Sequence, residues 1–188
     1  IGYGGAGSGS RSPKENTIHP GANDNASGTA GLLELAQKLS ANKGRLKRSI
    51  LLVGFDAEEK GLLGSKYFVE KPTLPLTQIK TMINMDMIGR VKDSVVNIGG
   101  VGTSPVFRPL IDSLKFIHPL TLTLSDAGLG PSDHASFYTK EIPVLFFFSG
   151  FHDEYHTPED TWKKINLRGE KDILELVYDI VYSLSRLK

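Results

Sequence analysis

Apolar residues recur at helical spacing in several parts of the chain. Steps of three and four residues place side chains on one face of a helix, which is typical of amphipathic helices packed on a core. Four segments have this spacing. The first runs from Thr29 to Asn42-Lys43-Gly44, the second and third are 61–69 and 104–116, and the last is a C-terminal stretch through Ile173, Val177, Ile180 and Leu184. We expect Ser27 or Thr29 to cap the first helix, and Pro105 to occupy the first helical position of 104–116.

Short apolar runs separate these helices and predict strands. The runs are 49–55, 81–88, 95–98, 120–124 and 144–148. Continuous apolar runs are typical of strands buried on both faces, and Val144–Phe148, the most apolar, should be central. In 120–124 Leu and Thr alternate, as in a half-exposed strand. Strands that alternate with helices predict an α/β fold, with a mixed, largely parallel sheet sandwiched by helices in a single domain over 1–188.

Composition and charge narrow the classes of function. The chain has 188 residues with 22 Lys+Arg against 21 Asp+Glu, so no electrostatic footprint for nucleic acid stands out. There is no cysteine, which excludes disulfides, thiolate zinc sites and a cysteine nucleophile. No apolar run is long enough for a transmembrane helix. We expect a secreted or periplasmic protein, although the lack of cysteine leaves the compartment open, and the oligomeric state stays open as well.

The N-terminal part has the composition of a loop. Residues 1–31 are rich in Gly and Ser, with little capacity to bury apolar surface. We therefore expect residues 1–18 to be poorly packed. Because the chain starts with Ile1 rather than Met, we expect a processed protein or an excised fragment.

Acidic and imidazole side chains gather after the apolar runs. They are Asp24 before the first helix, Asp56, Glu58 and Glu59 after 49–55, Asp86 in 81–88, and His152, Asp153, Glu154 and His156 after 144–148. In open α/β sheets, ligands bind beyond the carboxyl ends of the strands. Clustered carboxylates repel one another, a divalent cation relieves this repulsion, and imidazole shifts the preference toward Zn²⁺. Of the adjacent Glu58 and Glu59, one can bind metal while the other acts as a base in metal-assisted hydrolysis.

Five short motifs occur in an order that resembles a known family. They are GANDNASGTA with Asp24, FDAEEKGLLGS with Glu58-Glu59, NMDMIGR with Asp86, SDHASF at 132–137, and YHTPEDT with His156. Together they resemble the co-catalytic two-zinc aminopeptidases, a family that includes bacterial leucyl aminopeptidases, glutamate carboxypeptidase II and glutaminyl cyclases. The resemblance implies a zinc-exopeptidase-like three-layer fold and an aminopeptidase acting on peptides with a free N-terminus.

The resemblance also implies a role for each site residue. Asp24 bridges two zinc ions, Glu59 and His156 complete one zinc site, Asp86 serves the other, and Glu58 is the general base. Relatives supply a further His from an H-x-D motif upstream, which this sequence lacks. The resemblance therefore implies truncation at the N-terminal side, two Zn²⁺ in the complete enzyme, and at most one well-occupied zinc in this chain.

Other interpretations stay open from the residues alone. A glutaminyl cyclase shares the scaffold with a single working zinc, and a receptor-like binding module shares it without catalysis. Asp133 either orients a metal ligand or caps the helix that follows it. Tyr138 and Phe151 line a substrate pocket or belong to the core. We assign His19, His118 and His152 no metal role.

Overall fold

The computed structural model describes residues 2–3, 9–12 and 17–187. The strands are β1 (Gly2–Tyr3), β2 (Ile18–His19), β3 (Met82–Met85), β4 (Val95–Gly99), β5 (Thr121–Leu124) and β6 (Val144–Phe148). The α-helices are α1 (Gly28–Ala41), α2 (Leu63–Glu70), α3 (Phe107–Leu114), α4 (His134–Tyr138) and α5 (Leu167–Arg186). Within this part of the chain, no helix is both long and apolar enough to span a bilayer.

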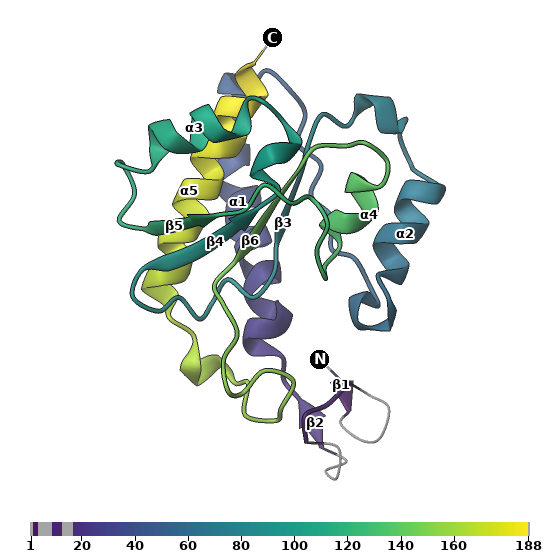
Figure 1. Cartoon of the computed structure of the whole chain (residues 1–188), viewed down its shortest axis with the longest axis vertical. Helices are drawn as coiled ribbons and strands as arrows, with labels where there is room; N and C mark the ends of the chain where they lie inside the picture. The colour runs from purple at the N-terminus through teal and green to yellow at the C-terminus, as the bar shows by residue number, and fades with distance from the viewer. Residues whose placement is uncertain (1, 4–8, 13–16, 188) are drawn as a thin grey trace.

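A mixed four-stranded sheet organises the fold. Its order is β3-β6-β4-β5, with β3 parallel to β6, β4 parallel to β5, and β4 antiparallel to β6. Helices α1, α3 and α5 lie on one side of the sheet, and α2 and α4 lie on the other (Figure 1). The expected α/β fold with helices on both faces is confirmed, and Val144–Phe148 is an internal strand as expected.

The layers are held together by two apolar cores. The larger core joins α1, α3 and α5 to the sheet, and side chains from its different elements, such as Leu35, Ile111, Val96 and Leu176, are almost fully buried. In the smaller core, Phe68 of α2 and Phe137 of α4 pack with ring centroids 5.7 Å apart. Because β6 contributes Val144 to the smaller core and Phe147 to the larger one, its near-continuous apolar sequence follows from burial on both faces.

The expected strand at 49–55 is wrong. The structure assigns no strand to this segment, and Leu51 and Leu52 are 55% and 39% exposed. A strand requires a neighbour that accepts and donates its backbone hydrogen bonds. None of the described residues provides such a neighbour for 49–55, so an apolar pattern alone does not produce a strand here.

One expected helix start is wrong, and the expected cap bond of another helix is absent. The Ser27 hydroxyl donates to the carbonyl oxygen of Asn23 at 2.7 Å and makes no cap bond to α1, which begins at Gly28, so Thr29 lies inside the helix. Pro105 lies in a turn closed by the bond from Phe107 N to Ser104 O at 3.2 Å, and α3 begins only at Phe107. At Ser27 a bond within the preceding turn replaces the cap bond, and at Pro105 a turn replaces the first residues of the expected helix.

The described part of the N-terminal segment makes specific contacts. Backbone N of Arg11 donates to the carbonyl oxygen of His156 at 3.0 Å, and the Arg11 guanidinium donates to Asp153 O at 3.3 Å. β1 pairs antiparallel with β2. These hydrogen bonds anchor residues 9–11, but none of residues 9–12, 17 and 18 is buried, in line with the expected poor packing. Positions 1, 4–8 and 13–16 lie outside the described residues.

Candidate metal centre

Four loop segments bring the predicted site residues to one end of the fold. Because β3 and β6 are parallel neighbours, their carboxyl ends lie at the same edge, which carries Asp86 after β3 and the His156 loop after β6. Asp24 lies in the turn Ala22–Ser27 before α1, and Glu58 and Glu59 lie in a 3₁₀ turn before α2. The starts of α1 and α2 and the loop after β6 all lie at the lower end of the view in Figure 1.

Asp24, Glu59 and His156 form a tight cluster. The Nε2 atom of His156 lies 2.9 Å from Asp24 Oδ2 and 3.0 Å from Glu59 Oε1. One ligand atom from each residue lies within 4.8 Å of the others, so a single cation can contact all of them. The other ring nitrogen, Nδ1, lies 3.0 Å from the carbonyl oxygen of Gly9. Since a carbonyl only accepts, Nδ1 carries a proton and Nε2 is the atom available for binding.

The charges of the site indicate a need for a cation. Burial, together with the charges of Glu59, Asp86 and other carboxylates nearby, raises the pKa of Glu58 to about 8. Burial likewise raises the pKa of Asp86 to about 6. The hydrogen bonds to Asp24 and Glu59 raise the pKa of His156 to about 10, so the imidazolium partly balances the carboxylates. Two carboxylates and one imidazole are a donor set that suits Zn²⁺.

Asp86 lies near this cluster but outside it. It is not among the residues whose ligand atoms meet within 4.8 Å, although its charge interacts with those of Asp24 and Glu59. Its Oδ1 atom is buried and has no hydrogen-bond partner among the described residues. A buried carboxylate oxygen without a partner is costly, and a bound cation would satisfy it.

Left-handed backbone conformations accompany the site residues. Ala57, just before Glu58, has φ 56°, and Met87, just after Asp86, has φ 55°. His156 itself has φ 57°. Non-glycine residues seldom adopt these angles, and the surrounding structure has to hold them there. The strained backbone conformations therefore occur at the site residues or directly beside them in the chain.

Asp160 is a site residue that the sequence analysis missed. It is 1% exposed, and its carboxylate accepts hydrogen bonds from the backbone N of Asn23, at 3.1 and 3.0 Å, and of Asp24, at 3.1 Å. It belongs to the same turn as His156, so it connects the segments that carry two members of the cluster. Its place four residues after His156, in the motif YHTPEDT, was the available signal.

Three further histidines, His19, His118 and His152, lie outside the cluster. His19 is bonded to Ser10 Oγ at 2.8 Å and to Thr17 O at 3.0 Å. His118 is paired with Asp179 at 3.0 Å, and His152 with Glu154 at 3.2 Å.

Asp133 does not cap the helix that follows it. It precedes α4, but its side chain makes no cap bond, so the interpretation as a helix cap is wrong. Its Oδ1 atom is buried without a hydrogen-bond partner in the described part of the chain, and its charge contributes to the raised pKa of Glu58. The structure thus places Asp133 beside the general-base candidate.

A row of aromatic contacts leads from the cluster to a cavity of about 220 Å³. Successive ring centroids along the row lie 3.8 Å apart for His156–Tyr155, 5.2 Å for Tyr155–Phe151, 5.0 Å for Phe151–Phe148, 5.9 Å for Phe148–Phe146 and 4.4 Å for Phe146–His134.

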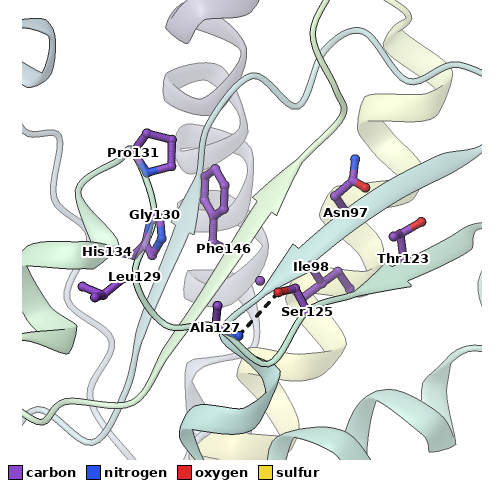
Figure 2. Close-up of a pocket in the computed structure, with 11 residues that line it drawn as sticks. Asn97, Ile98, Thr123, Ser125, Ala127, Leu129, Gly130, Pro131, His134 and Phe146 are labelled. Atoms are coloured by element: carbon purple, nitrogen blue, oxygen red, sulfur yellow. Dashed lines mark hydrogen bonds between the residues drawn. The ribbon is translucent and has the colours of Figure 1, made fainter.

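Figure 2 shows His134 and Phe146 on one side of the cavity, with Asn97, Thr123 and Ser125 across from them. Burial lowers the pKa of His134 to about 4, so its ring is neutral at pH 7. Phe151 is 71% exposed and belongs to this row of rings, but it lies neither in the core nor among the residues that line the cavity. Tyr138, 38% exposed, is not among the residues that line the cavity.

Comparisons with known proteins agree with this geometry. The sequence model of peptidase family M28 matches residues 9–181. The chain is 31% identical over 174 residues to aminopeptidase YwaD of Bacillus subtilis, covering 87% of this chain and 37% of that protein. The structure matches that of the Legionella pneumophila LapA aminopeptidase with a TM-score of 0.79 and 26% identity, covering 92% of this chain and 50% of that one. It matches BSAP, a zinc aminopeptidase from Bacillus subtilis, with a TM-score of 0.73 and 27% identity, covering 90% and 44%. The chain therefore spans half or less of the length of these relatives.

Proposed function

The chain belongs to peptidase family M28, and from this membership we propose that it carries the catalytic centre of a zinc-dependent aminopeptidase. The observation that carries the proposal is the meeting of Asp24, Glu59 and His156 within 4.8 Å, with Glu58 beside them. Zinc bound there would lower the pKa of water and polarise the scissile carbonyl group. The zinc named for the relative BSAP supports this choice of metal.

The residues of the chain have distinct roles in this proposal. Asp24, Glu59 and His156 would hold one ion, and Asp24 and Asp86 would contribute to a second ion in the complete enzyme. Two carboxylates are too few ligands for tight zinc binding, so the second ion would require at least one further ligand. Glu58 takes the proton of the attacking water and delivers it to the leaving amine.

The substrate is a peptide with a free N-terminus. The excess of carboxylates around the cluster favours a protonated amino group nearby, which selects the N-terminal residue of a peptide. The wall formed by Tyr155, Phe151 and Phe148 next to His156 favours an apolar N-terminal side chain. We also propose a secreted or periplasmic location, which fractionation of the source cells would test.

Glu58→Gln in the full-length protein is the direct test of the proposed function. We expect zinc content to stay as in the unaltered protein, while turnover of leucine anilide falls by at least about 10²–10⁴, as is typical for loss of a proton-transfer group. The matched control is Asp56→Asn in the same loop, because among the described residues the Asp56 side chain only accepts from the adjacent backbone N of Ala57, at 2.8 Å. The control should keep its activity.

Other outcomes would identify the alternatives. Conversion of an N-terminal glutaminyl peptide to its cyclic product, without hydrolysis of the anilide, would replace the proposal with a glutaminyl cyclase. Stoichiometric zinc with neither activity would replace it with a binding module. A protein that hydrolyses the anilide while zinc is absent would refute the metal-dependent mechanism.

A further inference from the structure

We propose that Asn25 is a positioning residue that holds the carboxylates of Asp24 and Asp86 in register for the second ion. This inference rests on the proposed function, because it concerns the ion that these two residues would share. Asn25 lies next to Asp24 in the chain, but its side chain contacts the end of β3 instead of the cluster.

Three side chains of the Ala22–Ser27 turn bind three consecutive backbone amides after β3. Met87 N donates to Asn25 Oδ1 at 3.1 Å, Ile88 N donates to Ser27 Oγ at 3.1 Å, and Gly89 N donates to Asn23 Oδ1 at 2.8 Å. We call Asn23, Asn25 and Ser27 the amide clamp. Asp86 N still donates to Phe147 O of β6, and the clamp satisfies the three backbone amides that follow.

Asn25 contacts both residues that flank Asp86. Its Nδ2 donates to the carbonyl oxygen of Met85 at 3.0 Å, and its Oδ1 accepts from Met87 N at 3.1 Å. The same Oδ1 also accepts from the N of Gly28 at the start of α1, at 3.1 Å. One side-chain amide therefore ties the backbone on both sides of Asp86 to the turn that carries Asp24.

The positions of these two carboxylates need such a tie. Asp24 and Asp86 are both carboxylates on separate segments, and like charges brought to one site repel each other. The ladder bonds of β3 join it to β6 and do not involve the turn that carries Asp24. Metal ligands must be held to within about 0.5 Å of their working geometry. Residues that orient ligands without touching the metal therefore influence metal affinity strongly.

Asn166 provides a matched control for Asn25. Its side chain makes the same kinds of bond at the start of α5. Oδ1 accepts from Gly169 N at 3.0 Å, and Nδ2 donates at 2.8 Å to the carbonyl oxygen of Val91, a residue between β3 and β4. It flanks no site residue. The variants Asn25→Ala and Asn166→Ala each lose bonds of the same type, and only the first loses them beside Asp86.

The experiment measures zinc affinity in the full-length protein. Zinc is titrated into the metal-free protein in competition with a chromophoric chelator, and thermal unfolding of the metal-free protein is recorded in parallel. We expect both variants to unfold at a lower temperature than the unaltered protein. Only Asn25→Ala should lose affinity for the second zinc ion, by about 10–100-fold, while the first ion binds nearly as before.

The opposite results would overturn the inference. Unchanged affinity for the second ion in Asn25→Ala would show that the clamp is only structural. Equal losses in both variants, or equal loss of both ions in Asn25→Ala, would show a general loss of stability. If the unaltered protein binds fewer than two zinc ions, the two-ion centre of the proposed function is itself wrong, and the inference falls with it.

Discussion

Replacing Gly28 with alanine tests whether α1 approaches the end of β3 as closely as the structure indicates. Gly28 has ordinary helical angles, φ −61° and ψ −38°, so an alanine there suffers no backbone strain. A Cβ atom at Gly28, however, would lie 2.4 Å from the carbonyl oxygen of Met85 and 2.5 Å from Asn25 Oδ1. The first of these atoms belongs to the backbone at the end of β3 and cannot move without displacing Asp86.

The magnitude follows from opposing effects of known size. Alanine is favoured over glycine inside a helix by about 1 kcal/mol. Overpacking at a tight contact costs about 1–3 kcal/mol. Displacing the Asn25 amide also weakens its bonds to Met85 and Met87, each worth about 0.5–1.5 kcal/mol. The net effect is a destabilisation of about 2 kcal/mol, which lowers the melting temperature by about 4–8 °C for a protein of this size.

Urea unfolding of the metal-free protein measures this change directly, with Gly44→Ala as the control. A Cβ atom at Gly44 would have no atom within 4 Å apart from its chain neighbours. We expect the control to stay within about 0.5 kcal/mol of the unaltered protein, as surface substitutions usually do. If Gly28→Ala is as stable as the control or more stable, helix propensity dominates and the close approach of α1 to β3 is wrong.

The remaining predictions concern the metal centre. Asp24→Ala and His156→Ala should each release zinc and abolish activity, as elemental analysis and the anilide assay would reveal; stoichiometric zinc with full activity in both variants would mean the site is misplaced. The metal-free protein should melt at a lower temperature as the pH rises from about 6 to 9. Glu58 and His156 have raised pKa values when folded, so in this range the folded state holds protons that the unfolded chain has released. Saturating zinc should remove most of this dependence, and a melting temperature that rises over the same range would contradict the charges described here.

Most of the fold was predictable because its signals are local. The helical spacing of Ile173, Val177 and Ile180 predicts α5, and these side chains are buried in the larger core. The continuous apolar run Val144–Phe148 predicts an internal strand for the same reason, since its residues serve both cores. The segment 49–55 has the same kind of pattern, but pairing depends on a partner from elsewhere in the chain. An apolar pattern indicates that burial of the side chains is favourable, whereas a strand also requires a neighbouring strand that pairs with its backbone.

The grouping of Asp24, Glu59 and His156 was predictable because the chemistry of a candidate metal site is carried by residue type and order. Carboxylates and imidazole after strands are unusual, and the order of the motifs narrowed the interpretation to one family. The structure brings Asp24, Glu59 and His156 together and leaves Asp86 slightly apart. The resemblance alone did not predict that Asp86 lies apart from the other three residues, because this distance depends on how two loops pack.

The supporting residues were not predictable, and the reason lies in what their side chains bind. Asn25 and Asp160 both make their described hydrogen bonds to backbone groups, and backbone groups leave no trace in a sequence. Asp160 binds the Asp24 turn from the His156 side, and Asn25 binds it from the Asp86 side. The turn that carries Asp24 is therefore restrained toward both neighbouring ligand candidates by separate residues.

This arrangement allows each half of the centre to be weakened separately. Asp160→Ala should therefore reduce affinity mainly for the ion shared with His156, which is the reverse of the result expected for Asn25→Ala. The same zinc titration measures both, and identical losses in the two variants would show that the turn moves as one unit.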